Sequence, residues 1–395
     1  MSRNRLDGLE GIRVLDLTHY VAGPFCTLMM GDAGADVVKL EPPEGDRVRN
    51  FPSSFPGESR LFLGLNRSKR SLAVNLRAEQ GRELAKKLAA QMDVFVEGYR
   101  PGAIEKFGLG ADDLMRENPR LIYLSVSAYG QGGPMRERRG IDPIIQTTAG
   151  IPAEQGGSGA PELVQGSFVD YMTGALAYGA VMMALYARER TGEGQRVDAS
   201  LLGGATAMQF GRLLWASDSE PVSDVVDALN DRIARVYEVS DGHIYLYMDV
   251  DGFWEKSSDI LGLPELLEEE AWRTFRGRHE ARGEIIPIVQ RVLLTAAGEE
   301  WVRRFEGEGV PCARVRKPTD LYEDPQMKAM GYLAQAEHPE YGVLRLGGIP
   351  VRFDKTPSSV RRPPPVLGQH TDEVLAELGL SFEEIAGLRR EDVVR

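Results

Sequence analysis

The first 200 residues of the sequence predict an α/β fold with a doubly wound parallel sheet, and a smaller α+β domain is expected from about residue 217. In the first part, short runs of β-branched residues alternate with helical stretches, which is the order of right-handed parallel βαβ units. Beyond it, shorter strands and acidic helical stretches replace this alternation. The chain has 395 residues, of which 42% are apolar and 27% charged, so it can form two or three folded domains.

The expected elements of this fold follow one another along the chain. Pro24 can start the first helix, because a helix does not use the N–H group that proline lacks at this position. The apolar run 171–187 is too short for a bilayer core and indicates a buried helix. A glycine-rich turn, 129–133, follows the fifth strand. Strands are expected at 12–17, 36–40, 71–76, 94–96, 121–126 and 243–247, and further helices at 79–92, 265–271 and 299–306.

Two features stand out near the end of the chain. Arg361–Pro365 contains three consecutive prolines and is expected to be an extended linker. A final amphipathic helix is expected over residues 371–378, where Thr371 can cap its start and Gly379 can end it.

Composition and missing motifs exclude several functions. The net charge of −12 gives no general attraction for nucleic acid or an anionic membrane. The turn after the first strand, Thr18–Pro24, has no G-x-G-x-x-G for a dinucleotide, and the chain has no P-loop motif. Five scattered histidines and two distant cysteines form no pattern of metal ligands, so no metal site is expected. The polar start, Met1–Glu10, has no signal-peptide stretch, and we expect a cytoplasmic protein.

Asp170 is the most conspicuous acid of the sequence. It is the last charge before the apolar run 171–187, at the expected start of a helix. One interpretation is structural, because Ser167 and Asp170 have capping-box spacing and an acid in the first turn complements the helix dipole. The other is that this carboxylate takes part in chemistry. Spacing alone leaves both open.

Motifs along nearly the whole chain resemble those of the class III coenzyme A transferases, the CaiB/BaiF-type family of formyl-CoA and carnitine CoA transferases. Each motif is short, but their order along the chain is specific. The matching segments are Leu9–Thr18, Ala22–Cys26, Gly34–Glu41, Asn66–Ser71, Val96–Gly102, Val169–Gly174, Arg190–Gln195, Gly309–Cys312 and Leu367–Val374.

The resemblance implies that Asp170 is the catalytic residue. Its carboxylate would attack the thioester of an acyl-CoA, form a mixed anhydride, and then carry CoA as an aspartyl thioester to a second carboxylic acid. The enzyme would need no permanently bound cofactor, because CoA enters as acyl-CoA substrate. We also expect the backbone N–H groups at the helix N-terminus to bind the developing oxyanion.

The resemblance also implies a binding site for CoA. Ala22 would lie in the turn that faces the nucleotide, Tyr129 beside the reactive thioester, and Lys106 where the family has a phosphate-binding arginine. A lysine keeps the charge of that arginine but not its bidentate geometry. Taken one at a time, such residues are as often solvated charges or core aromatic residues. The walls of the site would be formed by Val74, Asn75, Arg77, Gly98, Tyr99 and Arg100.

Several positions depart from formyl-CoA transferase. That enzyme has a glutamine, an arginine and a lysine where this chain has Val21, Pro42 and Ser127. Its run of four glycines, which closes over the intermediate, has no counterpart near Asn230–Arg232. Formate and oxalate are therefore not carried over as substrates.

Two alternatives to a CoA transferase remain. One is a non-catalytic CoA-binding protein, and the other is a racemase or isomerase of CoA thioesters on the same fold. The racemase branch has a histidine where Ile141 stands, and the following Asp142 supplies only half of a two-sided proton exchange. Asp142 is instead interpreted as a helix N-cap before Pro143.

The family fold implies how the domains are divided along the chain. Residues 1–215 and 331–395 would build the large CoA-binding domain from both chain ends, and residues 216–330 the small domain. Two such chains are expected to interlink as a homodimer.

Overall fold

The computed structural model describes residues 7–155, 160–214 and 232–395. The chain forms two compact units: the larger contains Met1–Ile151, Leu163–Leu213 and Pro325–Arg395, and the smaller Pro152–Glu162 and Leu214–Asp324. The described residues from 7 onward and the last residues of the chain thus belong to the same unit. The start of the chain up to residue 6, the expected boundary between residues 215 and 216, and residues 230 and 231 lie outside the described part.

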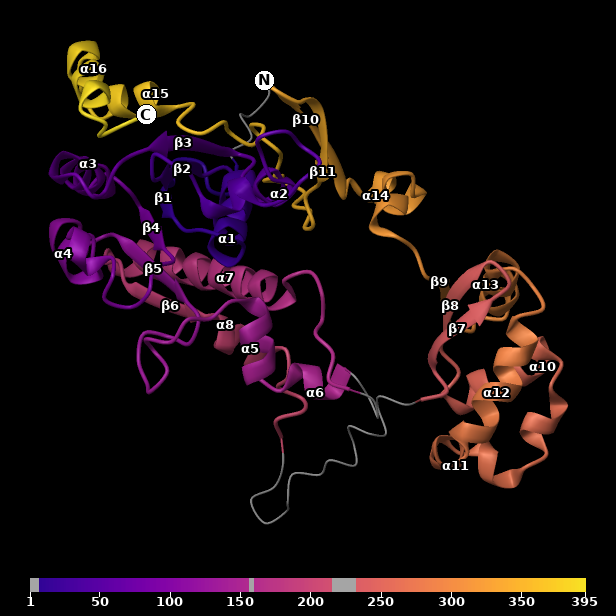
Figure 1. Cartoon of the computed structure of the whole chain (residues 1–395). Coiled ribbons are helices and arrows are strands. Elements are labelled where there is room, and N and C mark those ends of the chain that lie inside the picture. The colour runs from indigo at the N-terminus through magenta and orange to yellow at the C-terminus, as the bar shows by residue number, and fades with distance from the viewer. Residues whose placement is uncertain (1–6, 156–159, 215–231) are drawn as a thin grey trace. The chain divides into compact units, whose positions relative to one another are not determined.

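A six-stranded parallel sheet forms the centre of the larger unit (Figure 1). The strand order is β3-β2-β1-β4-β5-β6, and every neighbouring pair is parallel. The order reverses between β1 and β4, which makes this the switch point of the sheet. The predicted parallel sheet is therefore confirmed. Its strands are β1 (Arg13–Leu17), β2 (Asp36–Glu41), β3 (Lys69–Ala73), β4 (Val94–Glu97), β5 (Ile122–Ser127) and β6 (Arg196–Ser200).

Helices cover both faces of this sheet because alternate strand residues point to opposite sides. On β1, Leu15 and Leu17 belong to the core with α3, α4, α15 and α16, whereas Val14 belongs to the core with α1, α5, α7 and α8. The helices of this part are α1 (Ala22–Asp32), η1 (Arg47–Asn50), α2 (Arg60–Leu65), α3 (Glu79–Ala89), η2 (Glu105–Phe107), α4 (Ala111–Glu117), α5 (Asp142–Thr148), α6 (Ile151–Gln155), α7 (Phe168–Thr191) and α8 (Leu201–Ala207).

Helix α7 is longer and less buried than the sequence predicted. It packs against α1, α8 and β6. Its opposite side leaves Leu176, Met183 and Tyr186 exposed, so the expected buried helix is buried on one side only. Among the described residues, α7 is the one helix that could cross a membrane by length and composition, a test that core helices of soluble proteins also pass. Residues 171–187 are uncharged on all sides of the helix, so the sequence did not show which side of α7 is packed and which is exposed.

The smaller unit has its own antiparallel sheet, in the order β7-β8-β9, and a core around Trp254 and Trp301. The strand expected at 243–247 is β8, and the helix expected at 299–306 is α13. The stretch 265–271 forms two separate 3-10 turns instead of one helix, because the backbone of Glu269 is extended between them. The elements are β7 (Arg235–Val239), β8 (Gly242–Leu246), α10 (Asp251–Leu261), η3 (Pro264–Leu267), η4 (Glu270–Arg273), α11 (Phe275–Glu280), α12 (Arg282–Leu293), α13 (Gly298–Gly307), β9 (Cys312–Arg314) and η5 (Pro318–Tyr322).

The last 71 residues, Pro325–Arg395, return to the larger unit. Residues 361–365 have no helix or strand, as predicted for the linker. Gly379 has the left-handed conformation (φ 92°) that ends α15, but Thr371 does not cap this helix: its hydroxyl accepts from Ala73 N at 3.4 Å. The elements are α14 (Pro325–Met330), β10 (Leu333–His338), β11 (Gly342–Gly347), α15 (Thr371–Glu377) and α16 (Phe382–Arg390).

Candidate active site

The expected site residues lie in turns at one edge of the parallel sheet. The carboxyl ends of all its strands meet at this edge, and ligands of doubly wound proteins bind there near the switch point. Because α7 leads from this edge back to the start of β6, Asp170 in its first turn lies there too. The other residues follow strands: Ala22 follows β1, Val74, Asn75 and Arg77 follow β3, Gly98, Tyr99, Arg100 and Lys106 follow β4, and Tyr129 follows β5.

Asp170 is 9% exposed, and no described residue donates a hydrogen bond to its carboxylate. Ser167 precedes α7 in a left-handed conformation (φ 58°) and forms no hydrogen bond with its side chain to the helix. The capping-box interpretation of Ser167 and Asp170 is therefore wrong.

The cap of α7 comes from a different helix. Val169 N and Asp170 N both donate to Oδ2 of Asp142, at 2.8 and 3.1 Å. Asp142 is the first residue of α5, whose own N-cap is Ile141, so the expectation that Asp142 caps its own helix is also wrong. Since Asp142 occupies these two N–H groups, the predicted use of the helix N-terminus for an oxyanion is wrong for both of them.

Gln146 lies one turn further along α5 and fixes this arrangement. Its Nε2 donates to Asp142 Oδ1 at 2.5 Å and to the Val164 carbonyl oxygen at 2.8 Å, and its Oε1 accepts from Val164 N at 3.0 Å. Asp142 therefore accepts hydrogen bonds from three donors. Sequence reasoning missed Gln146, although its position four residues after Asp142 places the two on one face of a helix.

The surroundings of Asp170 favour its protonated form. Burial raises the pKa of Asp170 to about 7, and the nearby Asp142 carboxylate adds to the effect. No cation of the described residues offsets these two causes. Above pH 7 the carboxylate is ionised and more basic than an ordinary aspartate, which suits a nucleophile.

Close packing of α7 against α1 holds Asp170 beside the turn after β1. A Cβ atom on Gly174 would lie 2.5 Å from the carbonyl oxygen of Ala22 and 3.1 Å from the ring of Phe25. Only glycine allows this approach, one turn after Asp170. The rings of Phe25 and Tyr171 also meet edge to face, with centroids 4.9 Å apart. The structure thus brings Ala22 of the expected CoA turn to the helix of the expected nucleophile.

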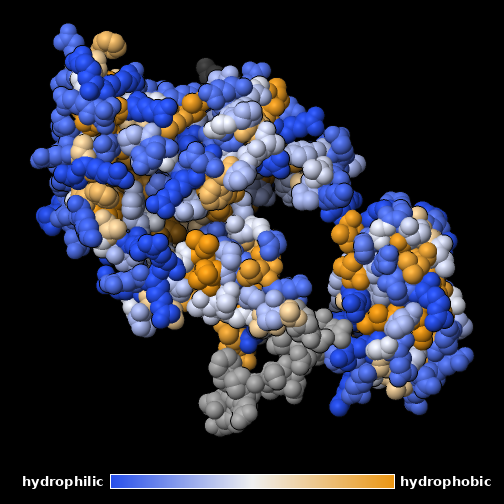
Figure 2. Space-filling model, viewed as in Figure 1, coloured by the Kyte–Doolittle hydropathy of each residue, from blue (hydrophilic) through white to orange (hydrophobic). Residues whose placement is uncertain are grey.

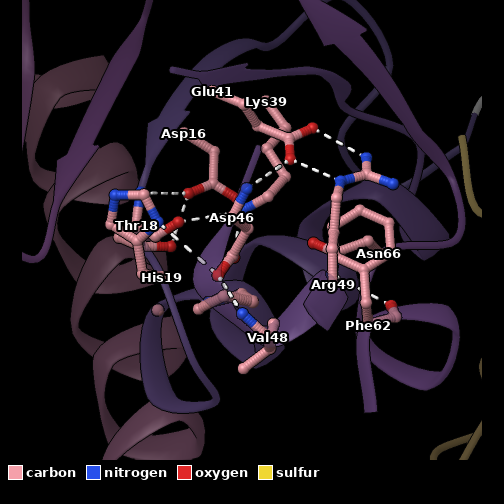
Figure 3. A network of polar contacts seen from close by, with 12 residues as sticks. Asp16, Thr18, His19, Lys39, Glu41, Asp46, Val48, Arg49, Phe62 and Asn66 are labelled. Atoms are coloured by element: carbon pink, nitrogen blue, oxygen red, sulfur yellow. Dashed lines mark hydrogen bonds and ion pairs between the residues drawn. The ribbon is translucent and has the colours of Figure 1, made fainter. Parts of the chain in front are cut away.

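The turn after β1 rests on a buried ion network, which we define as Asp16, Lys39, Glu41, Asp46, Arg49 and Lys69. Figure 3 shows its acids with Lys39 and Arg49. Lys69 Nζ lies 3.0 Å from Asp16 Oδ2, and Lys39 Nζ lies 3.1 Å from Asp46 Oδ2. Arg49 holds both oxygens of Glu41, at 2.7 and 2.9 Å. Every acid of this network has a cation.

The buried ion network fixes the backbone at Thr18, four residues before Ala22. Lys39 Nζ donates to the Thr18 carbonyl oxygen at 2.7 Å, and Thr18 N donates to Asp16 Oδ1 at 2.8 Å. Although burial disfavours its charge, Lys69 and Lys39 hold the pKa of Asp16 well below its usual range. Burial lowers the pKa of Lys69 to about 8. This network could not be recognised in the sequence, because its residues lie on separate elements.

The expected wall residues after β3 lie at the outer strand of the sheet. Val74 is buried and pairs with Val394 in an antiparallel bridge. Asn75 Oδ1 accepts from Arg77 N at 3.0 Å, and the Arg77 side chain is exposed. Four strand spacings of about 4.8 Å separate β3 from β5, or roughly 19 Å. A ligand that reaches from here to Tyr129 has to be long.

The turn after β4 contacts the turn after β1. The half-buried ring of Tyr99 meets the ring of His19 edge to face, with centroids 5.9 Å apart, while Gly98 and Arg100 are exposed. Glu97 shapes this turn, because its Oε2 accepts from Tyr99 N at 2.8 Å. Burial raises the pKa of Glu97 to about 7. The raised pKa could not be predicted from the sequence, because Glu97 looks like any polar residue at the end of a strand.

Lys106 and Tyr129 complete the set. Lys106 is exposed in η2, and Tyr129 is half-buried in the glycine-rich turn before α5. A Cβ atom on Gly140 would lie 3.2 Å from the ring of Tyr129, so this ring packs against the end of its own loop.

No metal site is found among residues 7–155, 160–214 and 232–395. In these ranges, no three or more His, Cys, Asp or Glu side chains are grouped so that they could hold an ion. Cys26 and Cys312 are buried free thiols in different units.

Comparisons with known proteins show which family the sequence and the fold match. The family model described as CoA-transferase family III matches residues 9–371. Human succinyl-CoA:glutarate CoA-transferase is 34% identical over 382 residues, which cover 95% of this chain and 87% of the relative. Formyl-CoA:oxalate CoA-transferase of Streptomyces coelicolor is 30% identical, with 98% and 99% covered. The crystal structure of a CaiB/BaiF family protein from Brucella suis superposes with a TM-score of 0.84 at 29% identity and covers 94% of this chain and all of that one.

The parallel sheet, the buried aspartate at its carboxyl edge and these matches define the chain as a CoA-transferring enzyme. Within that class it belongs to CoA-transferase family III. The resemblance read from the sequence motifs is confirmed.

Proposed function

We propose that the enzyme moves CoA from an acyl-CoA to a carboxylic acid with Asp170 as nucleophile. The observation that carries this proposal is the buried Asp170 carboxylate at the carboxyl edge of the sheet, to which no described residue donates a hydrogen bond. A carboxylate without such donors keeps its lone pairs for attack on a carbonyl carbon. Burial raises its pKa to about 7 and so increases its basicity.

The proposed reaction proceeds through two covalent intermediates. An oxygen of Asp170 attacks the thioester carbon, the C–S bond breaks, and CoA leaves as a thiolate while a mixed anhydride forms. The thiolate then attacks the Asp170 carbonyl carbon and releases the donor carboxylate, which leaves an aspartyl-CoA thioester. The acceptor carboxylate repeats the two steps in reverse order and restores Asp170. No proton, electron or metal ion is consumed.

The proposed substrates are succinyl-CoA as donor and a small dicarboxylic acid as acceptor. Support comes from the relative named succinyl-CoA:glutarate CoA-transferase. We place CoA across the sheet edge from Val74–Arg77 to Tyr129, with Ala22 and Gly98–Arg100 between them and Lys106 near its phosphates. Val21, Pro42 and Ser127 distinguish this pocket from that of formyl-CoA transferase.

Trapping tests the role of Asp170 directly. Wild-type protein incubated with succinyl-CoA and hydroxylamine should gain a hydroxamate on Asp170, seen by peptide mass spectrometry. The variant Asp170→Asn should bind CoA, lack the label and lose exchange activity by on the order of 10³-fold or more. A label on another residue, or exchange by the Asn variant at the wild-type rate, would show that Asp170 is not the nucleophile.

A second assay separates this reaction from that of a racemase. Ile141 cannot carry a proton, so the α-carbon of a 2-methylacyl-CoA should gain no deuterium in heavy water while CoA exchange proceeds. Rapid deuteration without a carboxylate acceptor would favour the racemase instead.

We further propose that two chains form an interlaced homodimer in the cytoplasm. An apolar surface over α5 and α8 supports self-association (Figure 2). Sedimentation velocity on dilution should find no folded monomer, and a folded monomer would contradict the interlaced form. Exposed apolar residues on α5, on α7 and just after α8 are Ile144, Phe168, Leu176, Met183, Tyr186, Met208, Phe210, Leu213 and Leu214.

A further inference from the structure

We infer that Asp142 is a positioning residue for the nucleophile: its carboxylate replaces that of Asp170 as the partner of the α7 N-terminus and places a fixed negative charge beside it. This inference rests on the proposed role of Asp170. It assigns to Asp142, on α5, a function that the reaction scheme above does not contain.

The hydrogen bonds at the start of α7 are the first observation. An acid in the first turn of a helix is normally drawn to the free N–H groups there, which stabilise its charge. Here Asp142 Oδ2 accepts from Val169 N and Asp170 N, and Tyr171 N donates to the Ser167 carbonyl oxygen. The carboxylate of Asp170 is thus left without these donors.

The rigidity of Asp142 is the second observation. It is 4% exposed, and both of its oxygens accept hydrogen bonds, from Gln146 on one side and from the α7 backbone on the other. Because all three partners are donors, the ionised form of Asp142 satisfies each of them. Gln146 is itself fixed by both backbone groups of Val164. The negative charge therefore cannot move away when Asp170 ionises.

Few other ionisable groups face Asp170. Helix α7 packs against α1, α5, α8, β5 and β6, and α8 has no titratable residue. Of the neighbouring acids, Asp32 is paired with Arg67 and Asp198 with Arg196, and the charges in the last turn of α7 are about 27 Å away. Asp142 is the one charge of the described residues that acts on Asp170. The other ionisable groups on these elements and in the turns at this edge of the sheet do not add to the shift of Asp170: His19, Tyr20, Cys26, Tyr123, Tyr129, Arg136, Glu137, Arg138, Arg139, Glu162, Tyr171, Tyr178 and Tyr186.

The consequence for the reaction follows from charge. Two carboxylates side by side repel each other, and this repulsion ends when Asp170 becomes a neutral anhydride or thioester. Asp142 thus raises the basicity of the free nucleophile and favours both covalent intermediates over it. A cation at the same place would lower the basicity of Asp170 and favour the free carboxylate over the covalent intermediates.

The test is the pH dependence of kcat/KM for CoA exchange in matched variants. Wild type should lose activity as the pH falls through about 7, where Asp170 gains a proton. In Asp142→Asn this acid limb should move down by about one pH unit or more, and in Asp142→Glu, which keeps the charge, it should return toward the wild-type position. Asp142→Ser is a second neutral variant, should the Asn protein not fold.

The control is Gln146→Ala, which loosens the same contact without removing the charge. Its exchange rate should fall while its acid limb stays in place. All variants are assayed with the same substrates. A difference between their acid limbs therefore reflects ionisation of the enzyme and not of a substrate. An unmoved limb in both neutral variants, or an equal shift in Gln146→Ala, overturns the inference. Activity in Asp170→Asn would instead overturn the proposed function, so the two failures are distinguishable.

Discussion

Two groups of buried carboxylates lie at the carboxyl edge of the sheet, and they differ in their cations. In the buried ion network, Asp16 and Asp46 are paired with Lys69 and Lys39, and each has a pKa well below the usual range. At the start of α7, Asp142 and Asp170 lie together with no cation from the described residues, and the pKa of Asp170 is raised to about 7. Both groups are buried to a similar extent.

Burial alone does not decide whether a carboxylic acid is ionised at neutral pH. Burial disfavours the charged form in both places, and a neighbouring charge either outweighs it or adds to it. In the buried ion network, the charged groups are paired with one another and hold the backbone at Thr18. Asp170 has no such partner, and its carboxylate oxygens stay available for reaction. One chemical change, aspartate to asparagine, should therefore have opposite effects on stability in the two groups.

The largest expected effect on stability is the loss of a charge in the buried ion network. Asp16→Asn leaves Lys69 without its carboxylate and should lower the free energy of unfolding by about 3 to 5 kcal/mol. Urea denaturation at pH 7 measures this. The double variant Asp16→Asn/Lys69→Met should recover part of the loss, and a stable single variant would show that the pair is not needed.

The opposite sign is expected for Asp170→Asn. Between pH 4 and 7 the folded protein keeps a proton on Asp170 that the unfolded chain has released, so wild-type stability falls as the pH rises through this window. The variant has no such dependence and should be more stable at pH 8 by on the order of 2 to 4 kcal/mol, with no difference near pH 4. Equal stabilities at pH 8 would mean that Asp170 has an ordinary pKa.

The smallest effect tests which residue caps α7. Ser167 makes no cap bond with its side chain, so Ser167→Ala should change the free energy of unfolding by less than about 0.5 kcal/mol. Ser381 forms a full capping box with Glu384 at the start of α16, and Ser381→Ala should cost about 1 kcal/mol. If both variants lost the same free energy of unfolding, Ser167 would have to be the residue that caps α7.

Much of the fold could be predicted because the signals are local. Runs such as Val94–Val96 and the helix expected over residues 79–92 depend on neighbours within one element, and they formed β4 and α3. Asp170 stood out for the same reason, as a charge next to a long apolar stretch. Ends of elements were less certain, as Thr371 shows, since its hydroxyl bonds to Ala73 and not to its own helix.

The chemistry around Asp170 could not be predicted because it joins distant parts of the chain. Asp142 caps a helix that begins 26 residues later, and its capping spacing relative to Pro143 pointed to the wrong helix. Lys39 was expected as a polar position in a strand, and Lys69 lies two residues before the strand expected at 71–76. Only the parallel pairing of β1, β2 and β3 brings both lysines to Asp16. The resemblance to a family identified Asp170 as the nucleophile, but it did not identify Asp142 and Gln146, which hold the start of its helix.

The pairing of the chain end with β3 has a consequence for synthesis. Asn75 N donates to the Val393 carbonyl oxygen and Arg395 N to that of Ala73. Residues 393–395 therefore cover the end of the outer strand of a sheet whose strands all come from the first 200 residues. At about 5 to 20 residues per second, a ribosome needs roughly 16 to 64 s to proceed from Ala73 to Arg395. During this time the edge of β3 has no partner from the chain end, and unpaired edges are where nascent chains associate wrongly. Production at low temperature with chaperones should therefore improve the yield of folded enzyme.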